Sequence, residues 1–346
     1  MARIGLPVKP PKTPSSAGGS SSWSAASLLR VAIGATAFRI LSALVAAFCA
    51  MVFARNTAAM PPQTFGLYPI LTRQVDRLVG QWLASPVTAP AVVSWLAFAG
   101  AMAMLLCVAR LDLDGDRAEG AVVLATVFPF AFIFGRSDAD ALFLLGALGA
   151  FWGFRQQKWV AGGVCGALAT ATIPSGIVIL PALAWIGFRQ SGAKRLRVAV
   201  ALLLTAAGFG AYLSYMYYRG GPPGGWAEGV SRWGFHLGQA PWLSLQHLFT
   251  SWPSPAGVTD AMNGVVTLIV LASVPVVWWL LDGGYAIYML AMLWLPLTSG
   301  KYDDLGRTCA LLFPLFIVLA SMRWRIVFIG LVITSAMFYA LALALM

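Results

Sequence analysis

Residues 120–154 read GAVVLATVFPFAFIFGRSDADALFLLGALGAFWGF, which is two apolar runs joined by one short charged turn. The first run covers 120–135 and the second covers 139–154, and Arg136 lies between them. Runs of about 15 residues with so short a connection predict a tight hairpin of membrane helices. Some helices of this kind do not cross the bilayer fully.

The rest of the chain also consists mainly of apolar runs separated by short polar connections. The protein has 346 residues, of which 60% are hydrophobic and 10% are charged, with a mean hydropathy of +0.80. Soluble domains carry roughly 25% charged residues, so this composition excludes cytosolic enzymes and secreted disulfide scaffolds. Further apolar runs lie near 28–54, 90–109, 159–172, 174–188, 196–218, 258–281, 284–298, 308–322 and 326–345. The sequence therefore predicts an all-α fold, a polytopic transmembrane bundle of about 10–11 helices.

The positions of the apolar runs divide the chain into two regions. Residues 1–27 are rich in Pro, Ser, Gly and Lys, which predicts a disordered cytoplasmic tail. Residues 28–346 are then a single multi-span membrane domain. The net charge of +11 comes mainly from Lys and Arg at the ends of apolar runs, a pattern of membrane orientation and not of nucleic-acid binding. Placing the tail in the cytoplasm puts residues 219–257 on the opposite, non-cytoplasmic side.

The connection at residues 219–257 is long and rich in tryptophan. It carries Arg232, Trp233 and His236 among its polar and aromatic residues. One interpretation is an interfacial segment whose indoles anchor at the headgroup level. The other is a partly re-entrant loop that covers a lipid-linked or sugar-bearing ligand.

Charged residues also gather in two short segments of the same predicted side. Arg136, Asp138 and Asp140 lie between two apolar runs, and Asp304 and Arg307 come directly before another. Ionisable groups are costly in such places and usually face a protein interior or a wet cavity. Each group is either part of a functional site or a local ion pair that caps the next helix.

Metal and cofactor motifs do not appear in the sequence. The acidic run 112–119 departs from the spacing of a calcium-binding loop and predicts a solvated cytoplasmic turn. The four cysteines form no pair with metal-ligand spacing, and we expect neither a metal nor a cofactor.

Several stretches resemble the PIG-V-type mannosyltransferases, the family of GPI mannosyltransferase II and its bacterial relatives. Residues 65–71 (FGLYPIL) are similar to that family's FPLYPLL stretch. Four further stretches are similar to its motifs and follow in the same order: 128–143 with FPFAF and SDADALF, 166–176 (GALATATIPSG), 233–242 (WGFHLGQAPW) and 297–316 with LTSG, LGR and FPLF. The match extends over about residues 65–322.

The resemblance implies a GT-C-type membrane glycosyltransferase. Such an enzyme transfers a hexose, typically mannose, from a polyprenyl-phosphate donor on the non-cytoplasmic face. It implies Asp140 as the first choice of catalytic carboxylate, with Asp138 beside it. The substrate and phosphate contacts are then sought among Arg136, Arg232, Trp233, His236, Asp304 and Arg307.

One family feature is missing. Family members carry an acidic motif in the first non-cytoplasmic loop, whereas residues 55–63 (RNTAAMPPQ) contain no carboxylate. A catalytically inactive relative that binds lipid-linked sugar or supports a partner membrane protein is therefore the alternative. A secondary transporter is a third hypothesis, although no internal repeat supports it. The predicted location is a bacterial plasma membrane, and the expected partners are the bilayer and the lipid-linked donor.

Overall fold

A computed structural model describes residues 67–79, 89–135, 138–190, 192–220, 240–243, 246, 255–299, 305–322, 326–334 and 337. All belong to one unit of packed chain, Val45–Met346. Over these residues the regular structure is helical, with no strand. The α-helices are α2 (Leu67–Val79), α3 (Ala89–Ala109), α4 (Gly115–Val127), α5 (Asp140–Arg155), α6 (Trp159–Thr172), α7 (Ile179–Gln190), α8 (Arg195–Gly220), α11 (Pro255–Leu280), α12 (Gly283–Ser299), α13 (Leu305–Leu311) and α14 (Phe313–Ser321). The 3₁₀ turns are η2 (Ala131–Gly135), η3 (Pro174–Val178) and η4 (Gly192–Lys194).

Two of the predicted helical runs are broken, and proline explains where. The run 120–135 is wrong as one helix: α4 ends at Val127, and the chain continues through an extended Phe128 into η2. Pro129 disfavours the helical conformation of the residue before it, which ends α4 at this point. The run 308–322 is likewise divided into α13 and α14, with Pro314 in the first turn of α14.

A further helix lies in a segment for which the sequence predicted only a connection. The motif at 65–71 runs into α2, whose first residues pack against α3. Tyr68, Val93 and Ala139 form a small buried cluster there, with Leu71 and Val75 packed against it. The start of α2 therefore lies beside the start of α5.

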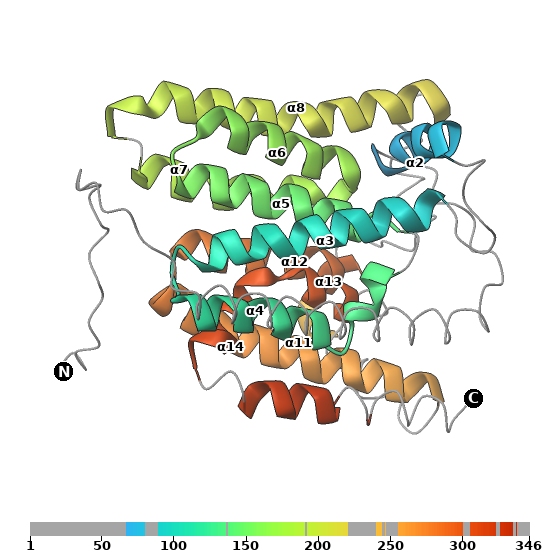
Figure 1. The fold of residues 1–346 in the computed structure, drawn as a ribbon, viewed down its shortest axis with the longest axis vertical. Helices are drawn as coiled ribbons and strands as arrows, with labels where there is room; N and C mark the ends of the chain where they lie inside the picture. The colour runs from blue at the N-terminus through green and yellow to red at the C-terminus, as the bar shows by residue number, and fades with distance from the viewer. Residues whose placement is uncertain are drawn as a thin grey trace, which may run out of the picture. The chain divides into compact units, whose positions relative to one another are not determined.

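Helices α3, α5, α6 and α8 lie side by side in that order (Figure 1). Small residues allow this close packing, as is usual where helices meet in a membrane. A Cβ on Gly153 of α5 would clash with the backbone of Gly162 on α6. A Cβ on Gly208 of α8 would clash with the carbonyl oxygen of Ala167 on α6.

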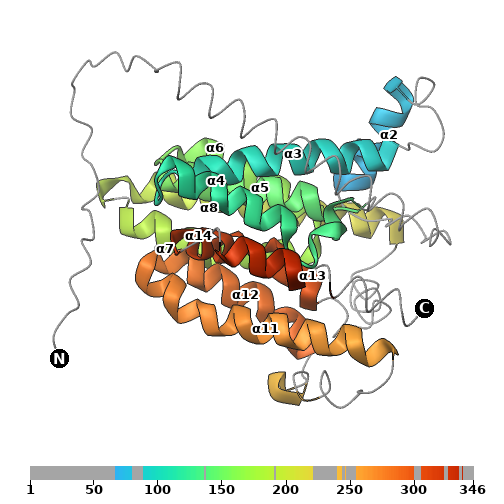
Figure 2. The same cartoon turned by 60° about the horizontal axis from the view of Figure 1, so that its bottom comes forward.

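Aromatic side chains fill the space between α5, α12 and α14. Phe151 of α5 lies 5.4 Å from Tyr285 and 5.2 Å from Tyr288 between ring centroids, and 5.1 Å from Phe313. All four side chains are fully buried. This cluster joins α12 and α14 to α5. Figure 2 shows the backbones of these helices.

Three of the described helices are long and apolar enough to cross a membrane: Ala89–Ala109, Arg195–Tyr215 and Asp260–Leu280. Shorter apolar helices cover Trp159–Thr172, Ser175–Gln190 and Gly283–Thr298. A helix of 14 residues is about 21 Å long, less than the roughly 30 Å of a hydrocarbon core. The count of 10–11 spans stays a prediction, and the tail 1–27 and the first run 28–54 lie outside the described residues.

The helices run back and forth between two ends. One end, called here the Asp140 end, contains the starts of α5 and α13 and the end of α4. The other, the Arg155 end, contains the ends of α3 and α5 and the starts of α4, α6, α8 and α12. Basic residues of the Arg155 end, within the described ranges, are Arg110, Arg117, Arg155, Lys158, Arg189, Lys194, Arg195 and Arg197.

Candidate functional site

The candidate site is built around the short segment between η2 and α5. Asp138 precedes the helix, and Asp140 is its first residue. A carboxylate in the first turn is favoured by the positive end of the helix dipole. The backbone N–H of Ala139 donates to Oδ1 of Asp138 over 2.7 Å, which fixes the orientation of that carboxylate.

Arg307 of α13 joins these two carboxylates. Its Nη2 lies 2.6 Å from Oδ2 of Asp138, and its Nε lies 2.7 Å from Oδ2 of Asp140. A guanidinium is planar and carries donors on two edges, so it suits two oxygens held in a fixed relation. The three charges thus connect the start of α5 to a helix that is far away in the sequence.

The position of Arg307 depends on its neighbour Gly306. The backbone N–H of Gly306 donates to Oδ1 of Asn263 on α11 over 3.1 Å. A Cβ at Gly306 would clash with Asn263 Oδ1 and with the ring of Phe130. Asn263 is fully buried. The start of α13 is therefore held against α11 and η2, and only glycine fits this approach without displacing them.

A second set of hydrogen bonds supports the segment from the other side. Ser94 of α3 donates through Oγ to the carbonyl oxygen of Asp138 over 3.0 Å. The hydroxyl of Tyr68 lies 2.9 Å from Ser94 Oγ and donates to the carbonyl oxygen of Pro90 over 2.8 Å. Burial raises the pKa of Tyr68 to about 12, so its hydroxyl keeps its proton at neutral pH. The aspartate segment is therefore tied to both α2 and α3.

The three charged side chains differ in how far they reach solvent. The side chain of Asp140 is 3% exposed, that of Asp138 is 13% exposed and that of Arg307 is 26% exposed. Removing such charges from water costs several kcal/mol per ion unless each has an opposite charge and hydrogen bonds. Asp140 is thus the anchored member of the group, while Asp138 and Arg307 lie nearer the surface.

This geometry bears on whether the aspartate segment is part of a functional site or only a local ion pair that caps α5. The carboxylates pair with an arginine from another helix, so the ion pair is not a local one that only caps α5. Asp138 and Asp140 are brought together with Arg307, as a shared site requires. The remaining candidates, Arg136, Arg232, Trp233, His236 and Asp304, lie outside the described residues.

The opposite end of α5 carries a second ion pair. The acidic run 112–119 was expected to be a solvated turn, and Asp112, Asp114 and Asp116 are exposed residues. The Asp112 side chain is nevertheless paired, because its Oδ1 accepts from Arg155 Nη2 over 2.6 Å. The two side chains are 16% and 15% exposed. The guanidinium also lies over the Tyr285 ring, 5.4 Å from its centroid. Asp112 meets Arg155 because α3 and α5 end beside each other and beside the start of α12.

Ser94 and Asn263 belong to the site, and sequence reasoning gave neither a role. Both are polar residues within apolar helices, which is the signal that marks them. Their partners lie on other helices, however, and the sequence shows no pairing. Among the described residues, no group of three or more His, Cys, Asp or Glu side chains could hold a metal ion.

Comparisons of the chain with protein-family models, with curated proteins and with solved structures give no match.

Proposed function

We propose that the protein is an integral membrane glycosyltransferase of the GT-C type, with a polytopic bundle of 10–11 helices. It transfers a hexose of the mannose type from a polyprenyl-phosphate donor, on the non-cytoplasmic face of a bacterial plasma membrane. The observation that carries the proposal is the convergence of Asp138, Asp140 and Arg307. The aspartates and the arginine come from two of the stretches that resemble the PIG-V-type enzymes.

The reaction needs one base and one group that stabilises negative charge. An acceptor hydroxyl oxygen attacks the anomeric carbon, the bond from that carbon to the phosphate oxygen breaks, and polyprenyl phosphate leaves. The hydroxyl proton passes to a carboxylate. Cationic donors stabilise the charge that develops on the departing phosphate.

We infer the role of each residue from the exposed fraction of its side chain. Asp138 is the base, because its carboxylate reaches solvent while that of Asp140 is covered. We assign Asp140 a positioning role, because its Oδ2 lies 2.7 Å from Nε of Arg307. About a quarter of the Arg307 side chain is exposed, and this part is the phosphate contact, since a guanidinium binds phosphate oxygens well.

The test uses the purified full-length protein in liposomes with polyprenyl-phosphate mannose labelled in the sugar. A membrane extract supplies the acceptors. Transfer is measured as label that has moved from the donor to these acceptors, after the remaining donor is separated from the products by chromatography. Asp138→Asn should lower the transfer rate roughly 100-fold or more, because loss of a general base costs about this much. Asp76→Asn is the matched control, since Asp76 is an exposed carboxylate of α2 at the same end. Full activity of the Asp138→Asn protein would contradict the proposal.

One observation favours the alternative of a protein that binds lipid-linked sugar without turning it over. Asp140 is almost fully covered and paired with Arg307, and residues 55–63 offer no other carboxylate. This alternative predicts that the wild-type protein retains labelled donor in a filter-binding assay while neither transferring nor hydrolysing it. Turnover by the wild type that depends on Asp138 would exclude it.

A further inference from the structure

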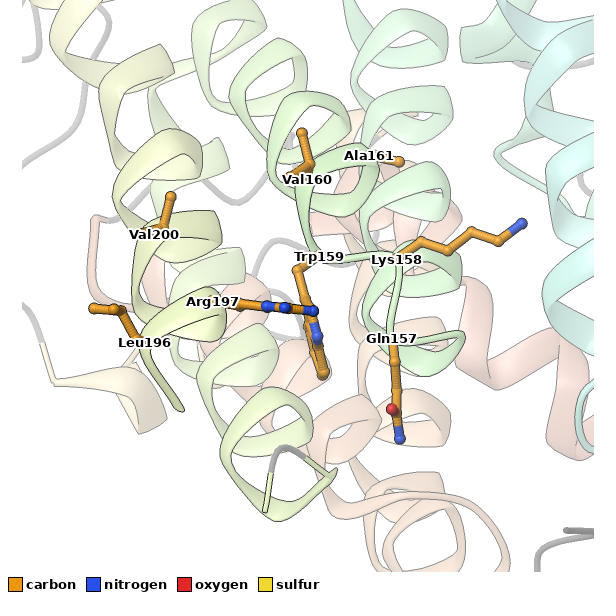
Figure 3. A pocket seen from close by; sticks show the side chains of 8 residues that line it. All are labelled: Gln157, Lys158, Trp159, Val160, Ala161, Leu196, Arg197 and Val200. Atoms are coloured by element: carbon orange, nitrogen blue, oxygen red, sulfur yellow. The ribbon is translucent and has the colours of Figure 1, made fainter. Parts of the chain in front are cut away.

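A groove of about 570 Å³ lies at the Arg155 end, away from the aspartate site (Figure 3). It is formed where α6 and α8 begin, and its lining includes Trp159, Val160, Leu196, Arg197 and Val200. Helix α8 contains one of the three candidate membrane spans, which begins at Arg195. The groove therefore lies at one end of a candidate membrane span.

The walls of the groove are apolar and uncovered. Val160 is 71% exposed, Leu196 is 77% exposed and Val200 is 52% exposed. The apolar surface continues away from the groove along both helices, through Val164 and Leu168 of α6 and Leu203 of α8. A continuous apolar surface of this kind is unfavourable in water and favourable against hydrocarbon chains.

Two cationic residues, Lys158 and Arg197, are among those that line the groove, and their side chains point in different directions. The side chain of Arg197 points towards the indole of Trp159 (Figure 3), and no acidic side chain pairs with it among the described residues. Lys158 points the other way, with its ammonium 4.3 Å from the centre of the Trp152 ring. Helix α6 also begins without a side-chain cap, so its positive end is open beside the groove. A ligand of this groove therefore needs a negative charge to pair with Arg197.

We propose that this groove binds an anionic phospholipid. Its phosphate contacts the Arg197 guanidinium, and its acyl chain lies along Val160, Leu196 and Val200. The groove combines a cation at the end of a membrane span with an apolar strip below it, and only an amphipathic anion complements both. Basic pockets between helices on the cytoplasmic side are typical sites for acidic headgroups. The site is separate from the aspartates, so it does not depend on the proposed function.

The test is native mass spectrometry of the full-length protein released from detergent micelles. Dioleoyl phosphatidylglycerol and dioleoyl phosphatidylcholine are titrated separately, and the bound lipid is counted. The wild type should bind phosphatidylglycerol more tightly than phosphatidylcholine. Arg197→Gln should weaken phosphatidylglycerol binding about tenfold, in line with the loss of one charge-assisted contact. Arg195→Gln is the matched control, an exposed arginine that does not line the groove, and it should bind like the wild type.

Two further arms test the ligand class and the apolar part of the site. Val200→Glu places a carboxylate on the apolar wall and should reduce phosphatidylglycerol binding without affecting the helix fold, as judged by circular dichroism. Inorganic phosphate at millimolar concentration should leave the thermal stability of delipidated protein unchanged. Equal binding of the two lipids, or an Arg197→Gln protein that binds phosphatidylglycerol like the wild type, would overturn the proposal. Stabilisation by inorganic phosphate that is lost in Arg197→Gln would overturn it in favour of a site for free phosphate.

Discussion

At each end of helix α5 one arginine forms ion pairs with carboxylates, and the two groups differ in their composition. At its first residue, one guanidinium contacts two carboxylates, Asp138 and Asp140. At its last residue, Arg155 contacts one carboxylate, Asp112, and lies over the ring of Tyr285. The helix has 16 residues, so the two groups are separated by roughly 24 Å.

The difference fits the roles that we propose for the two ends. At the Asp140 end the two carboxylates that contact Arg307 differ in exposure. A proton acceptor near the surface, held in place by a buried neighbour, suits acid–base chemistry. At the Arg155 end the guanidinium pairs with Asp112 and packs on an aromatic ring, which suits the joining of α3, α5 and α12.

The largest effect is expected from Arg307→Met. This change removes the guanidinium that contacts both carboxylates, one of them covered, and removal of one partner of a buried ion pair costs about 3 to 5 kcal/mol. The free energy of unfolding in detergent, followed by circular dichroism, should fall by about this amount. Arg307→Lys keeps the charge and should recover part of the loss. An unchanged unfolding midpoint for Arg307→Met would mean that the aspartate group does not need its cation.

A smaller effect is expected from Arg155→Met. Only one contacting carboxylate loses its partner, and methionine keeps most of the apolar contact with Tyr285. The cost should be about 1 to 3 kcal/mol in the same unfolding measurement, the usual cost of one unsatisfied buried polar group. Sugar transfer per folded molecule should stay at the wild-type level. A loss of transfer equal to that of Asp138→Asn would remove the proposed division between the two ends.

The smallest effect is expected from Tyr68→Phe. The change removes the hydroxyl that contacts Ser94 and Pro90 but leaves the ring in its buried cluster, so the unfolding free energy should fall by about 1 kcal/mol. The Ser94 hydroxyl still donates to Asp138. Protease cleavage near α2, measured by limited proteolysis, should become faster than in the wild type. Unchanged cleavage would show that packing alone holds α2 at the site.

Much of the fold was predictable because apolar runs mark helices directly. The runs 90–109, 159–172 and 284–298 agree with α3, α6 and α12 to within two residues. The breaks at Phe128 and Leu312 were missed because an apolar run continues through the proline that divides it. Helix α2 was missed because it is short and interrupted by polar residues such as Arg73 and Asp76.

Three of the candidate residues, Asp138, Asp140 and Arg307, were chosen from the sequence, but their pairing was not predictable. Asp138, Asp140 and Arg307 stand out because charge is rare in so apolar a chain. The sequence could not show that one arginine contacts both aspartates, nor that Asp112 pairs with Arg155. Those contacts depend on which helices are neighbours.

The sequence by itself determined that this is a helical, strongly apolar protein, and which few charges require an explanation. Composition and periodicity decide these points because they act residue by residue along the chain. Only the tertiary structure decided that Asp140 is covered and Asp138 is nearer the surface, and that Asn263 and Ser94 hold the segments on which the charges lie. Exposure and ion pairing arise when α3, α5, α11 and α13 pack together, because each charge in a low-dielectric interior needs its partner from another helix.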